Sequence, residues 1–141
     1  MNSKIVKLFL RFSLAAGFLS AVADRFGLWP ADISVWGTMD NFFAYTELIN
    51  PIVPKSLISP LGIIATGAEV IFGVLLIIGF KTELIAKLSG YLLLLFACAM
   101  TFSTGVKGAF DYSVFVASAA AFALSHMNQK YFEVDLLLSK S

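Results

Sequence analysis

Glu69 is the residue from which chemistry is most readily argued, because it is the one charged residue between Leu57 and Phe80. A charged group inside a bilayer costs about 2.5–3.5 kcal/mol on insertion scales, so chains hide it in a bundle or a wet cavity. At helical spacing, Glu69 shares one face with small or weakly polar residues: Gly62, Ala65, Thr66 and Gly73. We therefore expect Glu69 and Thr66 to point into a helical bundle.

Arg11 is the leading expected partner of Glu69. It lies within the first apolar segment, about 9 Å from its start at Ile5, and Glu69 lies about 16 Å from the end of its own segment at 1.5 Å per residue. The difference of about 7 Å in depth is within the combined reach of the two side chains on antiparallel helices. The spacing thus predicts a buried Arg11–Glu69 pair, with snorkelling of Arg11 to the headgroups as the alternative.

Other polar side chains could join this interior. Tyr91, in the third apolar segment, could offer its hydroxyl to a bundle partner. Secondary candidates lie in or beside the first and fourth segments: Ser13, Ser20, Asp24, Arg25 and Asp111. The first segment carries two polar stripes, Ser13–Gly17–Ser20–Asp24 and Arg11–Ala15–Phe18–Val22–Arg25. Such a set could bind a polar head group, relay a proton or hold helices together.

The sequence carries no self-contained catalytic or metal-binding motif. Its one histidine, His126, cannot complete a Ser/His/Asp set or a haem pair, and we expect no metal site. Its one cysteine, Cys98, excludes an intramolecular disulfide and a CxxC redox pair. No catalytic residue is therefore assigned, and whether the protein is an enzyme stays open. A net charge of +1 disfavours nucleic acid as a partner.

The composition predicts one all-α integral membrane domain over residues 1–141. The chain is 59% hydrophobic and 13% charged, against about 45–50% and about 25% in soluble domains. The apolar segments predict a bundle of four transmembrane helices, at about residues 5–23, 57–80, 84–102 and 109–126. The basic residues are concentrated on the side that holds both termini, which places the termini in the cytoplasm by the positive-inside rule. The protein then lies in a bilayer, with residues 28–56 outside.

The outer stretch of residues 28–56 is rich in aromatic residues, which favour the membrane interface. We expect a short interfacial helix from about Thr38 to Ile49, capped by Thr38 or Asp40 and stopped by Asn50-Pro51. This helix either seals the bundle or forms a lid over a ligand pocket.

Two motifs resemble the DoxX family of bacterial four-helix inner-membrane proteins. The first is Arg11 followed by a small-residue helix that ends Ala23-Asp24-Arg25-Phe26-Gly27. The second is Glu69, Gly73 and the run Leu76-Ile77-Ile78-Gly79-Phe80-Lys81-Thr82. The resemblance extends from Leu8 to Leu124, and it implies Arg11 and Glu69 as the matching polar pair.

The resemblance implies a bacterial inner-membrane location and a link to redox chemistry. Some family members resemble the small membrane subunit of a thiosulfate:quinone oxidoreductase, and others are linked to redox-stress complexes with soluble partner enzymes. Three hypotheses follow. The chain is a membrane subunit that anchors a soluble redox partner and binds a quinone; or it binds or transports a small molecule or proton at Glu69; or it is a structural bundle without its own activity. A homo-oligomer is compatible with each.

Overall fold

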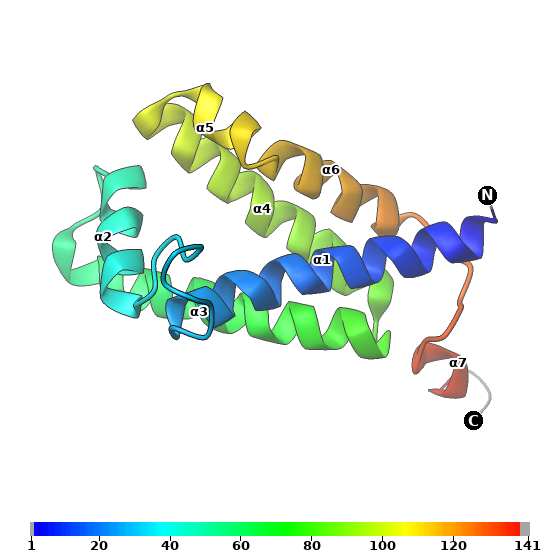
Figure 1. The fold of residues 1–141 in the computed structure, drawn as a ribbon. Helices are drawn as coiled ribbons and strands as arrows, with labels where there is room; N and C mark the ends of the chain where they lie inside the picture. The colour runs from blue at the N-terminus through cyan, green and yellow to red at the C-terminus, as the bar shows by residue number, and fades with distance from the viewer. Residues whose placement is uncertain (1, 139–141) are drawn as a thin grey trace.

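The described part of the chain, residues 2–138 of a computed structural model, is all-α (Figure 1). The helices are α1 Ser3–Arg25, α2 Met39–Ile49, α3 Lys55–Ile78, α4 Thr82–Thr104, α5 Val106–Asp111, α6 Val114–Ser125 and α7 Asp135–Leu138. Three of them, α1, α3 and α4, are long and apolar enough to cross a membrane. This supports the prediction of a membrane protein.

The prediction of one continuous helix over residues 109–126 is wrong. The chain turns at Tyr112 and Ser113 between α5 and α6, and Ser113 adopts a left-handed conformation with φ 55°. α6 has 12 residues, a length of about 18 Å, against about 30 Å for the hydrocarbon core of a bilayer. Composition alone did not reveal this break, because apolar residues continue on both sides of it.

Local signals explain the ends of α2 and α3. The hydroxyl oxygen of Thr38 accepts a hydrogen bond from the Asn41 amide at 3.2 Å, and α2 ends at Ile49, so the predicted short helix is confirmed. α3 ends before Gly79, whose φ of 71° is the left-handed conformation that glycine adopts at low cost. Its amide donates to the Leu75 carbonyl at 2.9 Å, which closes the helix end.

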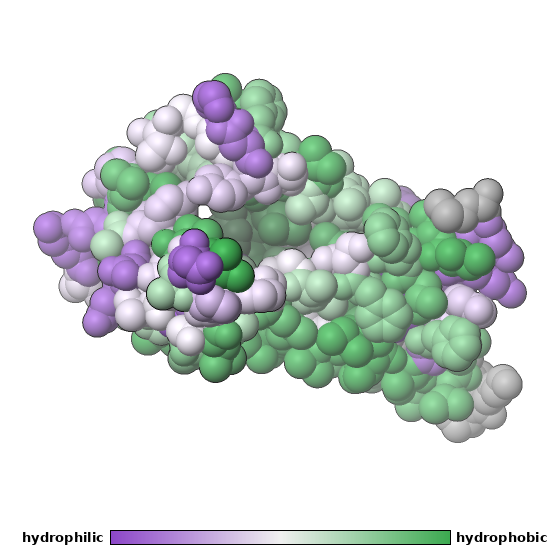
Figure 2. Space-filling model, viewed as in Figure 1, coloured by the Kyte–Doolittle hydropathy of each residue, from purple (hydrophilic) through white to green (hydrophobic). Residues whose placement is uncertain are grey.

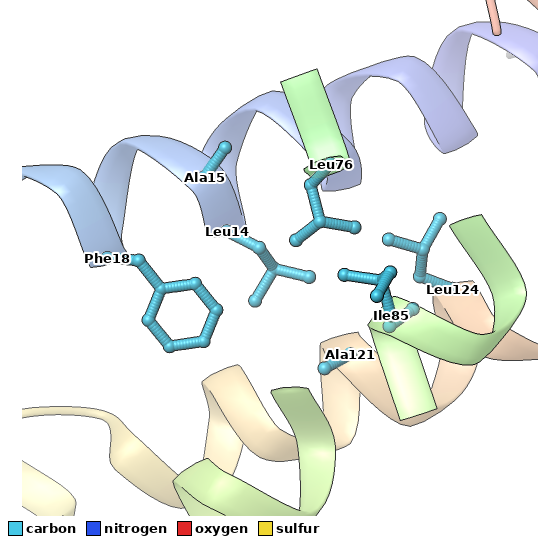
Figure 3. Packing of buried hydrophobic residues seen from close by; sticks show 8 residues of the cluster. Leu14, Ala15, Phe18, Leu76, Ile85, Ala121 and Leu124 are labelled. Atoms are coloured by element: carbon cyan, nitrogen blue, oxygen red, sulfur yellow. The ribbon is translucent and has the colours of Figure 1, made fainter. Parts of the chain in front are cut away.

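Four helices pack in two pairs, α1 along α3 and α4 along α6 (Figure 1). Contacts between α3 and α4 and between α1 and α6 join the two pairs. Figure 3 shows Leu14, Leu76, Ile85 and Leu124, from these four helices, pointing toward one another in the main apolar core. A second cluster contains Ile49 of α2, Ala97 and Met100 of α4, and Ala109 of α5. The first core therefore holds the long helices together, and the second fixes α2 over their end.

Two glycines let helices approach closely. A Cβ atom on Gly73 would lie 2.9 Å from Cγ of Leu19, and one on Gly90 would lie 2.8 Å from the Phe122 ring. The outer face of α3 is instead exposed and apolar, with Ile64 69% and Ile71 56% exposed. Small inner and large outer residues are the pattern of helices that pack together inside lipid.

Replacing Gly90 with leucine is expected to lower the free energy of unfolding by about 1–3 kcal/mol, because the Phe122 ring leaves no room for a side chain. Gly67→Leu is the matched control, since a Cβ at Gly67 meets nothing within 4 Å. Thermal unfolding in detergent measures both variants. Equal melting temperatures for the two variants would contradict the packing described here.

Candidate functional site

Arg25, and not Arg11, is the partner of Glu69. Arg25 Nη1 donates to Glu69 Oε2 and, at 2.8 Å, to the Thr66 hydroxyl, while Nη2 donates to Glu69 Oε1 at 3.2 Å. The side chains of Arg25 and Glu69 are only 2% and 4% exposed. Thr66 in turn donates to the Gly62 carbonyl at 2.8 Å. The inward orientation of Glu69 and Thr66 is confirmed, and the predicted Arg11–Glu69 pair is wrong.

Two aromatic rings enclose the Arg25 guanidinium. Its Cζ atom lies 3.6 Å from the centre of the Phe42 ring and 5.1 Å from that of Trp36, within the range of cation–π attraction. The centre of the Tyr45 ring lies 5.9 Å from that of the Trp36 ring. Burial raises the pKa of the Tyr45 hydroxyl, and the nearby Tyr112 raises it further, so Tyr45 stays neutral at physiological pH.

One donor in this site has no partner among the described residues. Arg25 Nε is buried and makes no hydrogen bond, although the two terminal nitrogens of the same guanidinium are both used. An unsatisfied buried donor costs about 1–3 kcal/mol, so it calls for an explanation. Arg25 Nε can donate a hydrogen bond to an acceptor on a bound molecule.

Asp24 organises the loop that carries Trp36. Its carboxylate accepts hydrogen bonds from the Ser34 hydroxyl, from the Val35 amide at 3.2 Å and from the Trp36 amide at 2.8 Å. Two neighbouring residues at the end of α1 thus have different partners: Asp24 binds the loop, and Arg25 binds Thr66 and Glu69 of α3. Asp24 and Arg25, predicted as secondary candidates, belong to the centre of the site.

Replacing Asp24 with asparagine is expected to loosen the loop, because an amide is a weaker acceptor than a carboxylate and one of its ends can only donate. Amide hydrogen exchange at Val35 and Trp36 should accelerate by about tenfold, the equivalent of about 1.4 kcal/mol in local opening. Asp32→Asn, in an exposed position of the same loop, is the control. Unchanged exchange at both amides in Asp24→Asn would contradict this role.

A second buried ionic cluster lies at the opposite end of α1. Arg11 donates to the last carbonyls of α3, from Nε to Leu76 at 2.9 Å and from Nη2 to Ile77 at 2.8 Å. Its Nη1 donates to the carbonyls of Tyr131 at 2.9 Å and Phe132 at 2.8 Å. Since the last carbonyls of a helix lack partners within it, they are the natural acceptors for this guanidinium. Arg11 therefore closes the end of α3 and does not reach Glu69.

Lys7 completes the second cluster together with Glu133. Lys7 Nζ lies 2.8 Å from Glu133 Oε1 and donates to the Gln129 carbonyl at 2.9 Å. Glu133 Oε1 also lies 3.8 Å from Arg11 Nη1. All three side chains are at most 1% exposed. Two buried cations thus share one carboxylate.

Glu133 was missed by the sequence reasoning, which named no candidate residue after Asp111. Residues 129–138 fold against the ends of α1, α3 and α4. The amides of Val134 and Asp135 donate to Ile78 and Gly79, and the Asp135 carboxylate accepts from Lys81 and Thr82 at the start of α4. The available signal was that Glu133 and Asp135 are the only acidic residues after Asp111, while Lys7 and Arg11 needed partners.

Four predicted candidates lie outside both clusters. Tyr91 is 51% exposed and packs its ring edge-on against Phe122, so its predicted role in the bundle interior is wrong. Ser13 is exposed, and Asp111 is exposed beside Lys107 at 2.5 Å. Ser20 takes part only through its carbonyl, which accepts from Trp29 Nε1 at 3.2 Å.

The fold and the two clusters describe a helical membrane protein that has a buried ionic cluster at each end of α1. Within residues 2–138, no group of three or more His, Cys, Asp or Glu side chains is placed to hold a metal ion. No protein-family model matches the chain, and no significant match is found among curated proteins or solved structures.

Proposed function

We propose that the protein is a DoxX-like integral membrane subunit of a redox-related complex and that the Arg25–Glu69 cluster binds a quinone head group. The observation that carries this proposal is the buried, unpartnered Arg25 Nε, which belongs to a guanidinium flanked by Phe42 and Trp36. A quinone is a planar ring with two carbonyl acceptors. It therefore suits a site that offers an unused donor beside aromatic faces.

The cluster also contains a group suited to proton transfer. Reduction of a quinone to a quinol consumes two electrons and two protons, the electrons coming from a soluble redox partner. Arg25 binds both Glu69 and the Thr66 hydroxyl. The Glu69 carboxylate would first take up a proton from water and then pass it to one quinone oxygen, and the second proton would come from water directly. Figure 2 shows a hollow with apolar residues inside it toward the end of the molecule that carries α2. Such a hollow gives the isoprenoid tail and ring of a quinone an approach from the membrane.

The same proposal gives the chain an orientation in a bacterial inner membrane. We place α1, α3, α4 and the successive helices α5 and α6 together as the transmembrane bundle, both termini in the cytoplasm, and α2 outside. The excess of basic residues at the end that carries the termini supports this orientation. On a Cys98→Ala background, Asn128→Cys should react with a membrane-impermeant maleimide only after cells are opened. Labelling in intact cells would reverse the orientation.

Quinone binding is tested by tryptophan fluorescence. The protein has two tryptophans, so Trp29→Phe leaves Trp36, beside the site, as the reporter. We expect saturable quenching by decyl-ubiquinone or a menaquinone analogue in detergent. The double variant Arg25→Gln/Glu69→Gln, which removes both charges together, should lose this quenching, while Tyr91→Phe should keep it. Equal quenching in the double variant would refute the site.

A structural role is the second candidate function. It is favoured by the fact that both Glu69 oxygens and both terminal Arg25 nitrogens already have partners within the protein. In that case the pair sets the register of α1 against α3, and quinone causes only unsaturable quenching.

A further inference from the structure

The Lys7–Arg11 cluster divides its donors between two parts of the chain. Arg11 Nε and Nη2 are committed to carbonyls at the end of α3. Among residues 2–138, Arg11 Nη1 and Lys7 Nζ bond only to the C-terminal segment, residues 129–138, through three carbonyls and the Glu133 carboxylate. If this segment moves away, α3 keeps its cap, and two cationic donors become free side by side.

The C-terminal segment is held by these contacts and by hydrogen bonds of Val134 and Asp135 to the end of α3 and the start of α4. Two of its large side chains contribute little to docking, since Phe132 and Leu137 are each 71% exposed. Phe132 also has a φ of 47°, a conformation that is uncommon and unfavourable for a bulky residue. A contact made by charge and hydrogen bonds, without a buried apolar anchor, can be replaced by another anion with enough acceptor atoms.

The surroundings of the cluster indicate what kind of anion this is. The side chains of α1 beside Lys7 and Arg11 are exposed and apolar, with Ile5 52% and Phe9 68% exposed. A phosphate offers several acceptor oxygens in place of the carboxylate and carbonyls, and basic pockets between membrane helices bind lipid head groups. Apolar surface beside the pocket suits acyl chains.

We propose that Lys7 and Arg11 form a binding site for the phosphate group of an anionic lipid, and that Glu133 of the chain's own C-terminal segment occupies this site as an internal competitor. Lipid phosphate and the Glu133 carboxylate bind in exchange for each other. The proposal is independent of quinone binding at the other end of α1.

The full chain in detergent is titrated with phosphatidylglycerol or phosphatidylcholine, and bound lipid is counted by native mass spectrometry. Glu133→Gln removes the competing charge and keeps the segment. Its apparent Kd for phosphatidylglycerol should fall by about threefold to tenfold, because the open site is more populated. Lys7→Gln/Glu133→Gln should lose this gain. Glu47→Gln, which breaks the exposed pair with Lys55, is the control and should match the unsubstituted protein.

Hydrogen exchange of the unsubstituted protein gives a second readout that does not depend on a variant folding. Phosphatidylglycerol should speed exchange at the Val134 and Asp135 amides, which bond to the end of α3, and phosphatidylcholine should not. Inorganic phosphate should compete only at millimolar concentration, because it lacks acyl chains. The proposal is overturned if Glu133→Gln leaves lipid affinity unchanged, if its gain survives Lys7→Gln, or if inorganic phosphate binds as tightly as the lipid.

Discussion

Replacing Glu69 with glutamine is expected to lower the free energy of unfolding by about 3–5 kcal/mol, because the buried charge of Arg25 loses its counter-ion. The Arg25 side chain is 2% exposed, so its charge is shielded from water in the folded state. A glutamine keeps the shape of the glutamate but replaces a charged acceptor with a neutral amide. Unfolding in mixed micelles, followed by circular dichroism, measures the loss.

Double variants identify the partner of Glu69. Arg25→Gln/Glu69→Gln should recover at least half of the loss, since no unpaired charge remains. Arg11→Gln/Glu69→Gln should be additive, because Arg11 hydrogen-bonds to other groups. Glu47→Gln, in the exposed pair with Lys55, should change stability by less than about 1 kcal/mol. Recovery in the Arg11 double variant, without recovery in the Arg25 one, would contradict the pairing described here.

Replacing Arg11 with glutamine is expected to lower the free energy of unfolding by about 3–5 kcal/mol. This loss arises at the end of α1 opposite to the Arg25–Glu69 pair. The change leaves the Leu76, Ile77, Tyr131 and Phe132 carbonyls short of a donor, and each unsatisfied buried group costs about 1–3 kcal/mol before the structure relaxes. Hydrogen exchange at Val134 and Asp135, which fix the C-terminal segment, should rise as well.

Arg11→Lys is the informative companion variant. An ammonium carries its three donors on one nitrogen and cannot reach both α3 and the C-terminal segment, as the three nitrogens of the planar guanidinium do. We expect lysine to recover less than half of the loss, although it restores the charge. Full recovery by lysine would show that charge alone, and not the geometry of the hydrogen bonds, stabilises this end.

The inner face of α3 could be predicted from the sequence, and the partner of Glu69 could not. Small residues at helical spacing around Glu69 mark the buried face, and Gly62, Ala65, Thr66 and Gly73 all lie on it. The depth argument for Arg11 assumed that α1 and α3 end at the same level. In the structure Arg11 lies level with Leu76 and Ile77, near the last residue of α3, so α1 extends beyond α3 there. This stagger brings Arg25, at the other end of α1, to Glu69.

The second cluster lay beyond sequence reasoning for a different reason. Gln129, Tyr131 and Glu133 belong to a short irregular stretch without periodicity, so no local pattern assigns them to a surface. Their contacts with Lys7 and Arg11 depend on where two distant ends of the chain meet. The same limit applies to the turn at Ser113, since its apolar neighbours are as compatible with one long helix as with two short ones.

The contacts of Arg11 have a consequence for biosynthesis. Its C-terminal partners, Tyr131 and Phe132, follow it by 120 and 121 residues. A ribosome adds about 5–20 residues per second, so Arg11 and Lys7 leave the ribosome many seconds before Glu133 exists. During that interval the nascent first helix must keep two cations in water or among lipid head groups. We therefore expect chains that terminate before residue 129, which lack Glu133 and the Gln129, Tyr131 and Phe132 carbonyls, to be less stable than the full chain.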